Sequence, residues 1–113
     1  MLSQERRISQ GFFNQILKEG RSFQTQNLSL RVVLRKDSLK SAFSFVVPAK
    51  IVKKAVLRNF LKRRGRYVVR KHLSKIKEGY FCAFFFKKEI SKLPFLVFEQ
   101  EILDSLKKAK LIE

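Results

Sequence analysis

The side chains that could do chemistry are concentrated in one basic stretch, residues 50–70. Because a helix turns by about 100° per residue, the polar members of this stretch fall on one contiguous arc of about 140°. These members are Arg58, Asn59, Lys62, Arg63, Arg66 and Arg70. On another side of the same helix the apolar residues Leu57, Leu61 and Val68 gather with His72. The spacing therefore predicts a helix with an apolar side for a core and a cationic side for a strongly anionic partner.

The charge of the whole chain points to the same kind of partner. The 113 residues include 26 Lys and Arg against 9 Asp and Glu, which gives a formal net charge of +17. No carboxylate occurs between Asp37 and Glu78, an interval that holds thirteen basic side chains. Such an excess destabilises a compact chain through self-repulsion unless a polyanion neutralises it. Nucleic acid is therefore the leading class of partner.

Residue types that could catalyse a reaction by themselves are sparse. One His and one Cys cannot form a zinc-type cluster, and the central region has no acids for a paired carboxylate or a Ser–His–Asp set. His72 lies on the apolar side of the predicted helix, which favours a packed or rim histidine. Cys82 lies in an apolar run, which favours a small core residue in a reducing compartment. We therefore expect neither catalytic side chains nor a dedicated metal site.

The rest of the chain supplies the elements that must position the basic helix. Apolar periodicity predicts a short helix over 9–20, strands over 28–35 and 42–47, the basic helix over 53–75, a strand over 80–86, and a last helix that starts near Ser91 and Pro94. Strand 80–86 is apolar on both faces, so we expect it in the centre of the sheet. Residues 1–8 are expected to be loose and residues 21–27 irregular. The predicted fold class is α+β, a single small domain over residues 1–113.

Two positions leave alternatives open. Gly65 inside the basic helix costs about 1 kcal/mol relative to Ala. It either lets the helix approach the sheet closely or is a tolerated weakness, and the second interpretation is slightly favoured. In the first helix, either Phe12 or Phe13 faces the core together with Ile16 and Leu17.

We expect the protein to act in the cytoplasm, as a monomer when free. Its first residues lack the apolar core of a signal peptide. No run approaches the ~18 apolar residues that a membrane helix needs, so no membrane partner is expected.

Two segments carry a resemblance to a known family. Ala55–Arg66, with the letters AVLRNFLKRRGR, resembles the signature helix of the protein component of bacterial ribonuclease P, of the form A-V-x-R-N-x-x-K-R-x-x-R. Phe13–Gly20 resembles the F-x-x-V-F-x-x-G pattern on that family's first helix, and the chain end through Ile112 is similar to its terminal helix. The resemblance covers most of residues 10–112, and the Arg–Asn helix is its most specific part.

The resemblance implies a partnership with a large catalytic RNA, which removes the 5′ leader of precursor tRNA in an Mg²⁺-dependent cleavage. It implies that Mg²⁺ is held at the RNA active site of the holoenzyme, and that the fold contains a left-handed βαβ crossover. Carried over by position, with Arg70 added from the helix arc, the RNA-binding residues are Lys50, Lys53, Lys54, Arg58, Asn59, Lys62, Arg63, Arg66 and Arg70. The cleft for the leader, between the first helix and the sheet, would include Phe13, Leu17 and Arg31.

Several residues depart from the family pattern. Phe60 stands where a basic residue is usual, and Pro48-Ala49 replaces a Ser-Lys pair. Leu17 and Arg31 replace aromatic residues of the cleft. These changes predict that leader binding relies less on stacking and more on charge.

A different class of function is also compatible with the charge. A non-catalytic RNA-binding protein, such as a ribosomal protein or an RNA chaperone, would have a similar size and net charge. The combination of Arg58-Asn59 with Phe13–Gly20 favours the ribonuclease P subunit. A stand-alone protein nuclease is disfavoured because the acid and base residues are missing.

Overall fold

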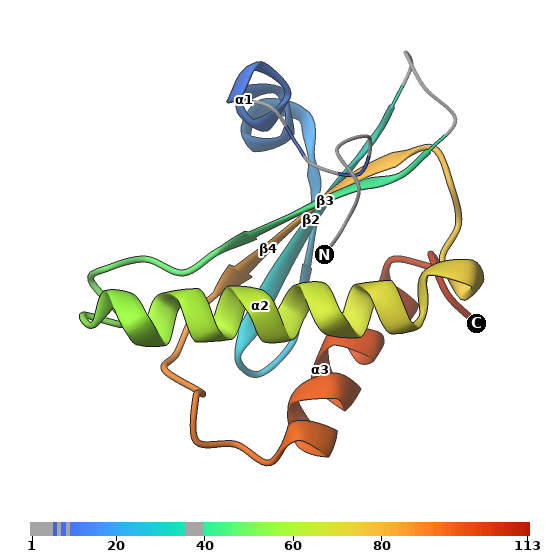
Figure 1. Ribbon diagram of the computed structural model, residues 1–113. Helices are drawn as coiled ribbons and strands as arrows, with labels where there is room; N and C mark the ends of the chain where they lie inside the picture. Colours follow the sequence, from blue (N-terminus) through green and yellow to red (C-terminus); the bar gives the residue numbers. More distant parts are fainter. Residues whose placement is uncertain (1–5, 7, 9, 36–39) are drawn as a thin grey trace.

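The computed structural model describes residues 6, 8, 10–35 and 40–113, and its helices pack on both faces of one sheet (Figure 1). The elements are α1 (Gln10–Glu19), β1 (Arg21–Gln24), β2 (Leu28–Leu34), β3 (Ala42–Val46), α2 (Ala55–Lys71), the 3₁₀ turn η2 (Leu73–Lys75), β4 (Tyr80–Phe86) and α3 (Phe95–Lys108). The predicted α+β class and element order are confirmed, with one strand added. Residue 9, where the first predicted helix begins, and residues 36–39, between two predicted strands, lie outside the described residues.

The four strands form one sheet in the order β1-β2-β4-β3. Strand β4 pairs antiparallel with β2 and parallel with β3, and Phe84 lies opposite Leu30 on one side and Phe45 on the other. Because β4 has neighbours on both edges and helices on both faces, five of its seven residues are buried. The predicted central position of this strand is confirmed.

Strand β1 corrects the expectation that residues 21–27 are irregular. Arg21–Gln24 pairs antiparallel with β2, with Phe23 opposite Leu30. Three of its four side chains are exposed, because it lies at the edge of the sheet. An edge strand held by backbone hydrogen bonds needs no apolar alternation, so periodicity could not reveal it.

The sheet separates two hydrophobic layers. Helices α2 and α3 cover one face, where Leu61, Phe84 and Phe98 belong to the larger core cluster. Helix α1 lies on the opposite face (Figure 1), where Ile16 and Phe81 belong to the smaller cluster. The basic helix and the proposed leader cleft therefore lie on different faces of the sheet.

Gly65 lets α2 pass directly over the sheet. A Cβ atom at this position would lie 2.5 Å from Cδ1 of Phe45, whose ring stacks on Phe84 at 4.8 Å between centroids. The favoured interpretation of Gly65 as a tolerated weakness is therefore wrong. The helix uses the missing side chain to approach β3 closely.

Helix α2 also makes the crossover between two parallel neighbours, β3 and β4. Parallel strands need such a long connection. The left-handed path that the resemblance implies stays a prediction. Because the crossover leaves from β3 and returns to the adjacent β4, α2 is fixed at both ends on the same face of the sheet.

Arg6, in the segment expected to be loose, is held by contacts with residues far along the chain. Arg6 donates two hydrogen bonds to the carboxylate of Glu78, at 2.8 and 2.7 Å, and a third to the carbonyl of Ser41 at 3.2 Å. Arg6, with help from the Ser41 amide, lowers the pKa of Glu78 to about 2. Within the expected loose segment, Arg6 is therefore fixed to the sheet; residues 1–5 and 7 lie outside the described part.

Among the described residues, no helix combines the length and apolar character needed to cross a bilayer.

Candidate nucleic-acid interface

Helix α2 presents the predicted basic residues on one surface, but not with equal exposure. Arg63, Arg70 and Asn59 are exposed, whereas Arg58, Lys62 and Arg66 are half-buried at its border. The buried side of the helix consists of Leu61, Gly65, Val68 and Val69. By the rotation of about 100° per residue, the direction opposite this buried side lies within about 5° of Arg63. The centre of the cationic surface is therefore shifted toward Arg63.

Three predicted lysines, Lys50, Lys53 and Lys54, lie just before the helix and are exposed. They are close in sequence to the positive N-terminal end of the α2 dipole, and the helix has no acidic residue in its first turn. This absence leaves the end of the helix favourable for an anion. The three lysines therefore lie exposed in the loop that leads into the basic helix.

Arg58 has an internal partner. Its Nη1 atom donates hydrogen bonds to the carbonyl oxygens of Val52 and Lys53, at 2.9 and 2.8 Å. The Lys54 side chain makes no capping hydrogen bond at the helix start. Arg58 therefore ties the preceding loop to the first turn, and its remaining donors stay available to a ligand.

The outer basic residues differ from Arg58 in their surroundings. Within residues 40–113, no hydrogen bond or ion pair to a protein group holds Lys62, Arg63, Arg66 or Arg70. Asn59 likewise has no protein partner in that range. A row of cations without internal counter-charges is suited to the phosphates of a nucleic acid.

Phe60 and Arg64 form the side of α2 that faces α3. The Arg64 guanidinium lies over the rings of Phe60, Phe95 and Phe98, at 5.1, 5.5 and 5.1 Å from their centroids. Its Nη1 atom donates to the Leu93 carbonyl at 3.1 Å. Phe60 is thus one wall of a cage around Arg64, which explains why this position carries an aromatic residue here.

At the C-terminal end of α2, a polar cluster of Lys71, His72 and Glu99 joins α2 to α3. Glu99 accepts hydrogen bonds from Nε2 of His72 at 3.0 Å and from Nζ of Lys71 at 2.9 Å. These two partners, His72 first, lower the pKa of the buried Glu99 carboxyl, and the same contact raises the pKa of Lys71. His72 is half-buried and contacts Glu99 of α3, which agrees with the expectation of a packed or rim histidine.

The second predicted surface lies between α1 and the sheet. Phe13 is half-buried beside Phe85, with 6.0 Å between ring centroids, and packs on the smaller core cluster. Leu17 is 44% exposed, and Arg31 donates a hydrogen bond to its carbonyl oxygen at 3.1 Å. The structure therefore brings Phe13, Leu17 and Arg31 to one side of the sheet. The side chain of Phe12 lies outside the described part.

Tyr67 was not among the predicted site residues. This residue lines a depression of ≈ 430 Å³ together with Arg63, Arg66 and Arg70. The helical rotation places Tyr67 about 40° from Arg63, next to the predicted arc. This angle could have indicated that Tyr67 faces outward with the arginines. An aromatic residue in a helix is, however, ordinarily assigned to the core.

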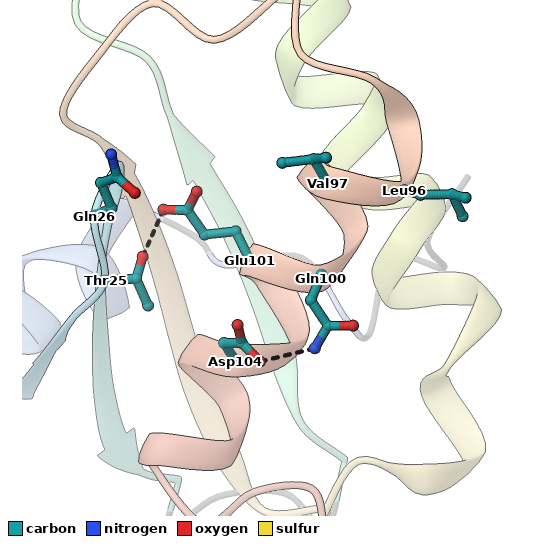
Figure 2. A pocket seen from close by; sticks show the side chains of 7 residues that line it. All are labelled: Thr25, Gln26, Leu96, Val97, Gln100, Glu101 and Asp104. Carbon is teal, nitrogen blue, oxygen red and sulfur yellow. Dashed lines mark hydrogen bonds between the residues drawn. The ribbon is translucent and has the colours of Figure 1, made fainter.

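A second depression lies between α3 and the β1–β2 turn, and polar contacts join its two walls. Figure 2 shows Glu101 reaching from α3 to Thr25 and Asp104 paired with Gln100. Glu101 accepts hydrogen bonds from Thr25 Oγ1 at 2.7 Å and from the Asn27 side chain at 2.8 Å. These contacts tie the β1–β2 turn to α3.

The side chains that could bind a metal ion or act as a nucleophilic thiol are also defined by the structure. The described residues contain no group of three or more His, Cys, Asp or Glu side chains arranged to hold a metal ion. Cys82 is buried in the core, and burial raises the pKa of its thiol.

Known proteins share both the sequence pattern and the fold. The Ribonuclease P protein component of Helicobacter acinonychis (strain Sheeba) is 39% identical over 71 residues, 63% of this chain and 46% of that protein. The chain spans about half the length of the curated relatives that it matches. The RNase P protein from Thermotoga maritima has a TM-score of 0.81 at 27% identity, covering 89% of this chain and 94% of that one.

A further solved structure, the RNase P protein of Staphylococcus aureus, has a TM-score of 0.86 at 24% identity and covers 96% of this chain and 98% of that one. At this identity the likeness concerns the fold alone. A family profile described as Ribonuclease P matches residues 1–110, nearly the whole chain. The matched residues include both the Arg58-Asn59 helix and the Phe13–Gly20 segment. The chain therefore belongs to the Ribonuclease P family.

Proposed function

We propose that this chain is the protein subunit of ribonuclease P and that it binds the catalytic RNA through the outward face of α2. The observation that carries the proposal is the row of cations on this face, Lys62, Arg63, Arg66 and Arg70, which have no protein partner within residues 40–113. Their contacts are expected to be mostly with phosphates, so that affinity falls steeply with salt.

Asn59 has a separate role in this proposal. It is exposed and uncharged, between cations on the same surface. Its amide both donates and accepts hydrogen bonds, so it can join a phosphate to a 2′-hydroxyl or to a water at the RNA surface. Arg58 holds the loop through Val52 and Lys53 and directs its remaining donors to the RNA.

The 5′ leader of precursor tRNA is assigned to the other face of the sheet. Phe13 and Leu17 on α1 and Arg31 on β2 supply two apolar surfaces and one cation there. With a single aromatic side chain among the three, binding would combine limited stacking with charge. The RNA-binding helix and the leader surface lie on opposite faces of the sheet, so one small protein would contact both RNAs at once.

The hydrolysis itself is assigned to the RNA. The central region between Asp37 and Glu78 contains no carboxylate that could act as a general base. Bound Mg²⁺ in the RNA would supply activation of the attacking water. This chain would bind and orient the RNAs and neutralise phosphate charge.

Reconstitution tests the proposal. The purified protein is combined with a bacterial ribonuclease P RNA and a precursor tRNA that carries a 5′ leader, at an Mg²⁺ concentration too low for the RNA alone. Wild-type protein should restore cleavage at the mature 5′ end. Folded protein that leaves the cleavage rate of the RNA unchanged would refute the proposal. Asn59→Ala, which removes an exposed side chain, should lower holoenzyme activity without changing the melting temperature.

A further inference from the structure

Tyr67 is an exposed aromatic ring on a cationic surface. Its side chain is 57% exposed, and the other large apolar side chains with such exposure among the described residues are aliphatic: Leu17, Leu34, Val56, Leu96 and Val97. The remaining described aromatic rings are more buried. Exposing an aromatic ring to solvent is less favourable than burying it. The position of this ring next to three arginines therefore needs an explanation.

The ring is held from one side. Tyr67 meets Phe95 of α3 edge to face, with 5.6 Å between centroids and 66° between planes. Phe95 is itself flanked by the cations of Arg64 and Lys71, at 5.5 and 5.9 Å from its centroid. Tyr67 is thus fixed in orientation by a well-packed neighbour while more than half of its surface is open to solvent.

Three arginines line the same depression as the Tyr67 ring. Arg63, Arg66 and Arg70 line one depression with Tyr67, of ≈ 430 Å³. The three arginines have no hydrogen-bonding or ionic partner in the described part of the chain. Such a group combines a flat stacking surface with the forked donors that match phosphate oxygens.

We propose that Tyr67 is a stacking platform for an unpaired nucleobase of single-stranded RNA, with Arg63 and Arg70 on the adjacent phosphates. A nucleobase is flat and is attached to a chain of phosphates, so one ligand satisfies the ring and the guanidinium groups together. An acidic peptide would satisfy the arginines but would leave the ring uncovered. The proposal deepens the RNA binding assigned to α2 above and rests on it.

The stacking site is separate from Arg58-Asn59. Tyr67 lies eight residues after Asn59, which is about 12 Å along the helix. It also lies beside α3, through Phe95, whereas Arg58 is tied to the loop before the helix. The two sites can therefore be altered independently.

Three variants and two probes test the stacking. Affinity is measured for a single-stranded oligoribonucleotide and for inorganic polyphosphate, which has the charge but no bases. Tyr67→Ala should weaken RNA binding about tenfold, which is the loss of affinity expected when one base–aromatic stack is removed. It should leave the affinity for polyphosphate unchanged. Tyr67→Phe keeps the ring and should bind RNA like the wild type. Leu96→Ala, which removes an exposed side chain from α3, is the matched control and should change neither affinity.

An optical readout reports the contact directly. The chain contains no Trp, so Tyr67→Trp introduces a single indole at the site. Its fluorescence should be quenched by the oligoribonucleotide and not by polyphosphate, and a Leu96→Trp reporter should respond to neither. Equal quenching by both probes, or RNA binding by Tyr67→Ala at wild-type strength, would overturn the proposal. A loss in Tyr67→Phe as large as in Tyr67→Ala would also overturn it, since the hydroxyl would then be the contact.

Two outcomes distinguish failure of the stacking site from failure of the proposed subunit function. If wild-type protein stimulates ribonuclease P RNA but Tyr67→Ala binds RNA normally, the stacking site is refuted and the subunit role stands. If binding of the oligoribonucleotide depends on the Tyr67 ring but the protein never stimulates the RNA, the site stands and the subunit role falls.

Discussion

Arg63 and Arg64 are adjacent in the sequence, yet their guanidinium groups have opposite surroundings. Arg64 lies over three phenylalanine rings and donates a hydrogen bond to the Leu93 carbonyl. Arg63 is exposed and has no protein partner within residues 40–113. One side of α2 therefore uses a cation to attach α3, whereas the other carries cations without a protein partner within residues 40–113. The net charge of the chain therefore overstates the number of cations available to a ligand, because some of them, such as Arg64, make internal contacts.

The inward side of α2 should be the more sensitive one, and Gly65 gives the largest expected effect. Gly65→Ala places a methyl group on the ring of Phe45, which is buried and stacked on Phe84. Overpacking of this kind should lower the free energy of unfolding by about 2–3 kcal/mol, measurable by urea denaturation.

The sign of that effect is what tests the close approach. At an exposed helical position, Gly→Ala stabilises by about 1 kcal/mol. If Gly65→Ala raises the free energy of unfolding, then α2 does not need its close contact with β3. RNA affinity of the folded variant should stay near that of the wild type.

The neighbouring arginines provide a matched pair with the next largest effect. Arg64→Ala should lower the free energy of unfolding by about 2 kcal/mol, because it removes a charged hydrogen bond and the contacts with three rings. Arg63→Ala should leave stability within about 0.5 kcal/mol of the wild type. It should instead reduce the slope of log affinity against log salt by about 0.7–0.9, the value for one phosphate contact.

Each member of the pair controls for the other. Denaturant unfolding and salt-dependent RNA binding are measured on both variants. If Arg64→Ala changes the salt slope as much as Arg63→Ala does, the division of α2 into a structural and a binding side is wrong.

Phe60 sharpens the same division with a smaller effect. The family resemblance predicts a basic residue at this position, and Phe60→Lys introduces one. Here the new ammonium would replace a wall of the Arg64 cage with a like charge. We expect a loss of about 1 kcal/mol in unfolding free energy and no gain in RNA affinity. A clear gain in affinity, with stability unchanged, would show that the side chain at position 60 faces the RNA.

The two sides of α2 could be predicted in outline and not in detail. Helical periodicity placed Leu61 and Val68 inward and Arg63 outward, because that division depends only on angles along the helix. The role of Arg64 depends on Phe95 and Phe98, about thirty residues away, and that of Gly65 on Phe45 in another element. Such tertiary contacts leave no local pattern.

The same limit explains the errors outside α2. Strand β1 has polar, exposed residues, and its pairing with β2 is made by the backbone. Arg6 sits in a segment of loose composition but reaches Glu78, which lies 72 residues further along the chain. Tyr67 was passed over because its value as a ligand contact comes from its exposure, which only packing reveals.

The smallest expected effect concerns the polar contact that joins α2 to α3. His72 and Lys71 lower the pKa of Glu99 from its usual value of 4.5. A lowered carboxyl pKa stabilises the fold above pH 4.5, and this contribution is lost as the pH falls through the pKa of the folded state. Glu99→Gln should therefore be less stable than the wild type at pH 7 by about 1 kcal/mol or less. The difference should shrink below pH 4.5.

Asp104→Asn is the matched control for that titration, because Asp104 is an exposed acid of the same helix whose partner is neutral Gln100. Its difference from the wild type should be smaller at pH 7 and should change little on acidification. Thermal unfolding from pH 7 to pH 3 measures both variants. If Glu99→Gln and Asp104→Asn follow the same pH profile, the contact of Glu99 with Lys71 and His72 adds nothing to the attachment of α3. The Arg64 cage would then hold the inward side of α2 to α3 without electrostatic help from its last turn.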